Sequence, residues 1–268
     1  MIERGRCGEP WPGRAVVLSL AMSGALAFGG APAAAELLDH HAVYELTLEG
    51  APPDSAEGRA EILVRRTCEQ WNYVFFLDMT AGEGLDATHV ELRQDFAEAL
   101  NHSVMAFRTR LATGDTGASR VEGQVVFTDG ENPAKVTVQR DQQAPRSAEL
   151  PAETIGKVQS ILGLTDALGQ GAQRAEFTVF DTRALKARLV EVAAAAEPLP
   201  GPRDTVSAPP GQSWPLVMTL TDQQETDRRV LNLHESGVIL WFRRSLGTGV
   251  EVTGQLIDLD LSERADCG

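Results

Sequence analysis

Residues 59–80 read RAEILVRRTCEQWNYVFFLDMT and contain two strand patterns on either side of a cysteine. In the first pattern Ala60, Ile62 and Val64 recur at every second position, which is the period of a half-buried strand. The second pattern, residues 71–80, is rich in aromatic and β-branched side chains, as central strands are. Two such strands joined by a short turn indicate an antiparallel pair.

Similar strand patterns recur along most of the chain, with a spacing of about ten residues. Turn signals such as Gly82-Glu83-Gly84 and Asp129-Gly130 separate them. This rhythm favours an antiparallel meander over alternating βαβ units. The further expected strands are 41–49, 88–96, 103–111, 122–128, 135–140, 174–180, 187–192, 214–220, 230–234, 238–243 and 250–261.

One segment breaks the strand rhythm. Residues 152–168 carry apolar side chains at helical spacing and are followed by glycines, which predicts a helix that packs its apolar stripe on the sheet. So many antiparallel strands must curl or close, because strand twist accumulates and open edges promote aggregation. The expected fold class is therefore mainly β: a curled, barrel-like antiparallel sheet with one main helix packed against it.

Two irregular features interrupt the later strands. Residues 193–212 are rich in Ala, Pro and Gly, which predicts a flexible loop. Because strand patterns resume after it, we interpret residues 36–268 as a single domain. In residues 250–261 the apolar phase changes near Gly254, which a β-bulge at that glycine would explain.

Residues 1–35 have the pattern of an export signal. Three arginines precede an apolar run at 15–28, and Ala33-Ala34-Ala35 offers a cleavage site before Glu36. We expect cleavage and export to the periplasm, which would leave no transmembrane span in the mature chain. The alternative is an N-terminal anchor that is never cut.

The chain has three cysteines, Cys7, Cys68 and Cys267, and cleavage would remove the first. An exported protein with two remaining cysteines usually pairs them. A Cys68–Cys267 bridge would close a loop of about 200 residues and contribute up to about 5 kcal/mol. Two inert thiols, or one intermolecular bridge, are the alternatives.

The charge balance and the motifs exclude several function classes. With 24 basic and 38 acidic residues the net charge is -14, which disfavours binding to nucleic acid or to anionic lipid surfaces. The five histidines form no recognisable metal or catalytic motif, so we expect no metal, no cofactor and no enzyme activity. A Ser, a His and an Asp could still meet in space, which keeps an uncharacterised hydrolase as an alternative.

Arginines and tryptophans are the remaining candidate binding residues. Arginine accounts for 21 of the 24 basic residues. Its pairs would suit a bidentate phosphate or carboxylate contact, although solvated strand faces explain them equally well. These pairs are Arg65-Arg66, Arg228-Arg229 and Arg243-Arg244. The candidate ligand or partner residues are Trp71, Trp214 and Trp241, which core packing would also explain.

Several landmarks occur in an order that resembles a known family. They are LDHHAVYELTL at 38–48, Cys68 followed by Trp71, Leu150-Pro151-Ala152, SWPL at 213–216, ESGV at 235–238, GQL at 254–256, and Cys267. The ordered set resembles the EipB family of periplasmic cell-envelope integrity proteins of α-proteobacteria. The sequence departs from the family pattern at His41, Ser236, Ile155 and Asp181.

The resemblance implies a β-spiral with one helix, a disulfide between Cys68 and Cys267, and a role in keeping the envelope intact. It implies no catalytic residues. Our leading hypothesis is a monomeric, non-enzymatic periplasmic protein that binds an amphipathic ligand (lipid, lipoprotein or peptide) on a concave sheet. The alternative is a scaffold that docks a periplasmic envelope protein and has a filled interior.

Overall fold

The computed structural model describes residues 36–49, 56–81, 88–114, 117–128, 131–221, 226–245 and 251–267. The expected signal peptide at 1–35 lies outside these residues, as do the turn signals at 82–84 and 129–130. The described residues form one 15-stranded sheet and one α-helix, which confirms the expected fold class. No helix among them is long and apolar enough to cross a bilayer.

The elements have the following bounds. The strands are β1 His40–Glu49, β2 Ala56–Arg66, β3 Gln70–Ala81, β4 Thr88–Ala99, β5 Val104–Thr113, β6 Ala118–Val126, β7 Ala134–Arg140, β8 Arg146–Leu150, β9 Thr154–Ile155, β10 Arg174–Asp181, β11 Lys186–Ala194, β12 Ser213–Thr221, β13 Thr226–His234, β14 Ile239–Ser245 and β15 Glu251–Leu261, and the helix is α1 Lys157–Gly169. The sequence did not predict β8 and β9, because β8 is almost entirely exposed and β9 has only two residues.

The strand order explains why the sheet curls. The first strand, β1, lies between β2 and the last strand, β15, so the two edges of the sheet are β8 and β9. Only residues 151–153 join these edges, and a segment that short spans about 14 Å at most. In a flat sheet of this width the edges would be about 65 Å apart. The sheet must therefore bend until the end of β8 comes close to the start of β9.

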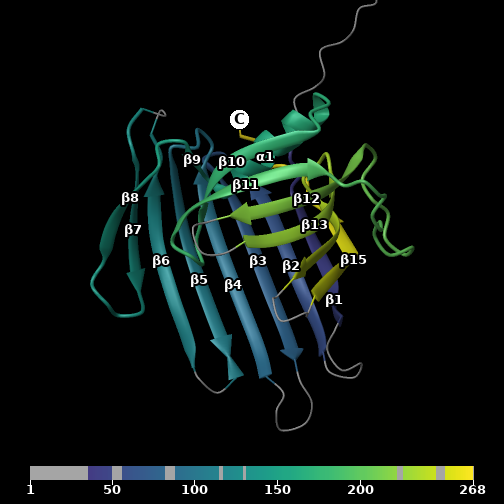
Figure 1. The fold of residues 1–268 in the computed structure, drawn as a ribbon, viewed down its shortest axis with the longest axis horizontal. Coiled ribbons are helices and arrows are strands. Elements are labelled where there is room, and N and C mark those ends of the chain that lie inside the picture. The colour runs from purple at the N-terminus through teal and green to yellow at the C-terminus, as the bar shows by residue number, and fades with distance from the viewer. Residues whose placement is uncertain are drawn as a thin grey trace, which may run out of the picture. The chain divides into compact units, whose positions relative to one another are not determined.

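The curl places the later strands across the earlier ones, with β10 to β13 in front of β2 to β5 (Figure 1). The contacts between the two halves include one aromatic pair and one side-chain hydrogen bond. The rings of Phe107 on β5 and Phe180 on β10 lie 5.3 Å apart. The Gln94 side chain on β4 donates a hydrogen bond to Thr182 Oγ1 just after β10, at 2.9 Å.

Apolar side chains fill the space beneath the helix. Val158 of α1 packs in a large cluster that includes Tyr73 and Phe96, whose rings meet edge to face at 5.8 Å. Leu164 and Leu168 of α1 pack in a second cluster on β10 to β13. The helix thus packs one apolar face against both clusters, and its apolar stripe serves as a packing face, as the sequence indicated.

Glu98 holds the start of the helix from across the interior. Its carboxylate is fully buried on β4 and accepts hydrogen bonds from the backbone N–H groups of Val158 (2.8 Å) and Gln159 (2.9 Å). His102 Nδ1 lies 2.7 Å from the same carboxylate. The negative charge therefore satisfies the free N–H groups of the first turn and interacts favourably with the helix dipole.

The helix begins at Lys157, five residues later than the sequence predicted. Thr154 and Ile155 pair in parallel with β10 instead, and this pairing uses the residues that would have formed the first helical turn. Gly156 then leads into α1 with an extended backbone (φ -79°, ψ 175°). A β-carbon at Gly156 would lie 2.4 Å from Glu98 Oε2, so only glycine leaves room for the carboxylate.

The β-bulge in β15 is real, but its predicted position was wrong. The register on β1 skips one residue between Val43, paired with Asp258, and Tyr44, paired with Leu256, so the extra residue is Ile257. Gly254 stays in phase with its neighbours and pairs with Leu46. Gly254 is required for a different reason: a β-carbon there would lie 2.2 Å from the Phe242 ring.

The segment between β11 and β12 runs along the sheet through irregular structure. The Arg203 backbone N–H donates to Leu256 O (2.9 Å), and the Asn232 side chain donates to Pro200 O (3.0 Å). Arg203 also pairs with Glu45. These contacts position the segment; the flexibility expected for residues 193–212 stays a prediction.

A disulfide joins Cys68, in the β2–β3 turn, to Cys267 near the end of the chain. The two Cα atoms are 5.4 Å apart and 199 residues separate the cysteines in sequence. Arg264 reinforces this junction by donating to Leu37 O at 2.9 Å. The C-terminal segment is therefore fastened to both the β2–β3 turn and the segment that precedes β1.

Reducing this disulfide should destabilise the protein through a gain of freedom in the unfolded chain. The chain-entropy model sets the loss at up to about 5 kcal/mol for a loop of about 200 residues. Melting temperatures of the oxidised protein, the reduced protein and the Cys68→Ser variant measure the effect. Reduction should lower the melting temperature of the unaltered protein and leave that of the Cys68→Ser variant unchanged. Equal melting temperatures for all three samples would contradict the prediction.

Replacing Gly156 by alanine should weaken the hydrogen bonds between Glu98 and the first turn of α1. The new methyl group would displace the carboxylate, and overpacking of this kind costs about 1–3 kcal/mol. Gly169→Ala is the matched control, because nothing lies within 4 Å of its β-carbon position and alanine favours a helix. Urea unfolding compares the two, and equal stabilities would contradict the proposed contact.

Candidate functional site

The candidate site is a polar network inside the curl, built from one arginine of each later pair. Side chains alternate across a strand, so the neighbours Arg228 and Arg229 face opposite sides of β13. Arg229 pairs in register with Arg244 of β14, and both share the face of the core residue Leu231. The arginine doublets that the sequence singled out therefore divide between the inner and the outer face.

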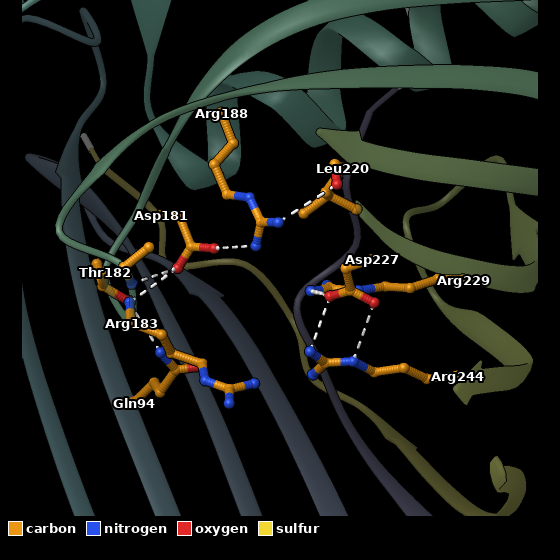
Figure 2. A network of polar contacts seen from close by, with 10 residues as sticks. Gln94, Asp181, Thr182, Arg183, Arg188, Leu220, Asp227, Arg229 and Arg244 are labelled. Atoms are coloured by element: carbon orange, nitrogen blue, oxygen red, sulfur yellow. Dashed lines mark hydrogen bonds and ion pairs between the residues drawn. The ribbon is translucent and has the colours of Figure 1, made fainter. Parts of the chain in front are cut away.

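Asp227 links the two inner arginines (Figure 2). Its Oδ2 lies 2.7 Å from Arg229 Nη2 and 2.8 Å from Arg244 Nη2, and its side chain is only 5% exposed. Arg244 Nε also donates to Oδ1 at 3.2 Å. Burial alone would raise the pKa of Asp227, but the hydrogen bonds and charges of the two arginines outweigh it and lower the pKa.

A second pair lies beside the first, where β10 turns into β11. Asp181 Oδ2 is 3.2 Å from Arg188 Nη1, and Arg188 Nη2 donates to Leu220 O at 3.3 Å. Burial opposes ionisation of Asp181, but hydrogen bonds from the Ala184 and Arg183 backbone N–H groups, together with Arg188, lower its pKa. Asp181 is therefore an anion that both matches Arg188 and fixes the turn.

That turn presents Arg183 to the network. Asp181 Oδ1 accepts the backbone N–H of Arg183 at 2.8 Å, while neighbouring Thr182 is tied to Gln94. The guanidinium of Arg183 extends toward Arg244 (Figure 2). Within the described residues no carboxylate pairs with it, and its charge helps to lower the pKa of Arg244.

Positive charge exceeds negative charge in this part of the interior. Burial, followed by repulsion from Arg229, lowers the pKa of Arg244 to about 10. Lys157 at the start of α1 lies 5.2 Å from the Tyr73 ring centre. Burial and then Arg229 lower its pKa to about 8. Ionisable groups with shifts of this kind cluster at binding and catalytic sites.

Apolar residues continue from the network along the inner face, away from the helix. Gln94 lies opposite Phe75 in register, and one step further Leu77, Leu92 and Leu111 stand side by side on β3, β4 and β5. Leu111 is 39% exposed although it shares a face with the buried Phe107. The inner surface is therefore filled beneath α1 and partly open at the other end.

Two shallow pockets lie on the described surface. One of about 310 Å³ is lined by Leu111, Thr113, Gly117, Ala118, Ser119 and Asp141. Another of about 220 Å³ is lined by Glu153, Ile155, Glu176, Phe177 and Thr178, beside the β9 edge. The first adjoins the exposed leucine of the inner face.

The three candidate tryptophans do not come together. Trp71 is buried three residues after Cys68, and the guanidinium groups of Arg66 (5.7 Å) and Arg264 (5.9 Å) lie near its ring. Trp214 packs with helix residues in the second cluster. Trp241 lies beside Arg243, whose guanidinium is 5.9 Å from its ring, on the opposite face from Arg244.

The histidines do not converge on one centre either. His41 contacts Glu61 (2.9 Å), His89 lies near Asp78 (3.6 Å), and His102 contacts Glu98. His234 Nδ1 lies 2.8 Å from Ser236 Oγ within one turn, where burial lowers its pKa. In the part of the chain that the structure describes, no three His, Cys, Asp or Glu side chains gather as metal ligands would.

Comparison with known proteins identifies the relatives of this fold. A family model described as EipB-like matches residues 31–211. The chain belongs to the EipB-like family. A crystal structure described as a β-barrel-like protein of the domain of unknown function DUF1849 from Brucella abortus is similar, with a TM-score of 0.73. The sequences are 19% identical over 85% of this chain and 99% of that chain. No curated protein matches the chain significantly.

The EipB-like match confirms the resemblance read from the ordered landmarks, and the similar crystal structure shows the same fold. Sequence reasoning did not find Asp227, Lys157 or Gln94. One signal was present: Asp181 to Arg183 stands where the sequence departs from the family pattern. The arginine pairs were the other signal, but the sequence did not show which member faces inward.

Asp227 should stabilise the fold in a pH-dependent way. Its folded-state pKa is lowered, so its contribution is complete above the ordinary aspartate pKa of about 3.9 and is lost as the pH falls through the lower folded value. Asp227→Asn should cost about 1–3 kcal/mol at pH 7, because both arginines keep partial contact with water. Chemical denaturation from pH 7 to pH 2.5 measures the difference in unfolding free energy between the unaltered protein and Asp227→Asn. A difference that stays constant with pH would contradict the assignment.

Proposed function

We propose that this EipB-like protein is a non-enzymatic periplasmic protein that supports the cell envelope by holding an amphipathic ligand in its curled sheet. One observation carries the proposal: the inner face is closed by α1 at one end, while apolar and arginine side chains remain partly exposed at the other. A surface of this kind can hold an apolar chain and a polar group together. The family resemblance supports the envelope role.

The separated histidines support a binding role over catalysis. Acyl transfer or hydrolysis needs a nucleophile, a base and an orienting group within hydrogen-bond reach. Here His41, His89 and His102 contact three different carboxylates on β2, β3 and β4. The inner polar network is made mainly of arginines and aspartates, which bind and orient charged groups.

A scaffold that docks an envelope protein is the second candidate function. The filled space beneath α1 favours it, and so does β8, an edge strand whose residues 146–149 are exposed. Exposed edge strands can accept a further strand from a partner. Purification from periplasm separates the two functions, because a carrier would retain a small amphiphile and a scaffold would retain a protein.

Complementation of a strain that lacks the gene tests the leading proposal. The deletion should make cells sensitive to detergent and to cell-wall antibiotics. Leu111→Glu adds a charge to the exposed apolar inner face and should fail to restore resistance, at an unchanged protein level. The matched control Val126→Glu changes a side chain of similar exposure (43%) on the other face of β6 and should restore it. Normal resistance of the deletion strain, or equal rescue by both variants, would contradict the proposal.

A further inference from the structure

Inside the curl three guanidinium groups lie near one carboxylate group, that of Asp227, which pairs with two of them. Arg229 and Arg244 share Asp227, Arg183 adds a third positive charge, and Asp181 is already matched by Arg188 (Figure 2). The network therefore holds more positive than negative charge. The whole chain has a net charge of -14, so this local excess is opposite in sign to the rest of the molecule.

Such an excess is costly unless something compensates it. Like charges that are partly withdrawn from water repel one another and lose hydration. The pairing of Arg229 directly opposite Arg244 is an unfavourable cross-strand arrangement that Asp227 offsets only in part. Arg229 and Arg244 keep about a third of their surface exposed, at 30% and 31%, so a bound anion can reach them.

The surroundings of the cluster match a long apolar chain. Thr182 next to Arg183 is bonded to Gln94, and Gln94 stands opposite Phe75 on the inner face. The leucine row of β3, β4 and β5 begins two residues further on, about 7 Å along the strands. The leucine side chains offer no hydrogen-bond partners, which favours an alkyl chain over a peptide backbone.

We propose that Arg183, Arg229 and Arg244 bind the acidic head group of a single-chain lipid, a carboxylate or a phosphate, whose chain lies on the adjoining apolar inner face. Guanidinium groups suit both head groups because they form bidentate, charge-assisted hydrogen bonds with either. This inference deepens the proposed function and rests on it: the amphipathic ligand is an anion.

Calorimetry on residues 36–268 with four probes tests the inference: dodecanoate, dodecyl phosphate, neutral dodecanol and inorganic phosphate. Both acidic lipids should bind at least tenfold more tightly than dodecanol. Arg183→Gln should weaken them about tenfold or more, since it removes one charge-assisted contact. It should leave dodecanol binding unchanged. Arg108→Gln is the matched control, because Arg108 lies on the outer face of β5 and is 58% exposed.

A second variant distinguishes a specific effect on the site from a loss of folding. Asp227→Asn removes the carboxylate that competes for Arg229 and Arg244, so it should tighten binding of dodecanoate several-fold. A damaged fold would weaken binding instead. Melting temperatures measured on the same samples establish that each variant is folded.

The outcomes separate the two levels of the proposal. Equal affinity for dodecanoate and dodecanol, unaffected by Arg183→Gln, would overturn the acidic head group and leave the apolar ligand in place. Binding of inorganic phosphate without binding of any lipid would overturn both, and would define a site for a free anion. The inference is established if the protein binds the acidic lipids more tightly than dodecanol, and if this affinity falls in Arg183→Gln and rises in Asp227→Asn.

Discussion

The three residues between β8 and β9 impose the constraint on which the whole structure depends. They join the two outer edges of one 15-stranded sheet, because β1 pairs with β15 in its middle. A link that short is compatible only with a sheet bent back on itself. Curling in turn creates an inside and an outside, and every later feature of the molecule depends on that distinction.

The interior created by the curl is held by a few polar anchors within a large apolar core. Glu98 reaches from β4 to the first turn of α1, and Tyr44 on β1 donates a hydrogen bond to Ile239 O at 2.8 Å. Buried carboxylates and hydroxyls are costly without partners, so each of these contacts also favours one arrangement of the curl over its alternatives. The disulfide ties the chain end to the turn before β3, outside this core.

The candidate site is a product of the same geometry. Alternation along β13 and β14 sends Arg229 and Arg244 inward, and the curl brings Arg183 from the β10–β11 turn to meet them. The charge excess there exists only because Arg183 faces Arg229 and Arg244, which follow it by 46 and 61 residues in sequence. An acidic protein thus presents a positive patch, bounded by aromatic and aliphatic side chains, toward its own concave face.

The sequence by itself determined the strand pattern, the presence of one helix, the curled fold class and the family, because alternation, turn residues and landmark order are local properties. It placed the bulge at Gly254, where the glycine instead accommodates the Phe242 ring, and it began the helix too early. Only the tertiary structure decided which arginine of each pair faces inward, that Glu98 binds the start of α1, and that Asp181 pairs with one guanidinium group whereas Asp227 pairs with two. These are contacts between distant segments, and their partners are fixed by strand register and by the curl that the short β8–β9 link imposes, neither of which a local pattern encodes.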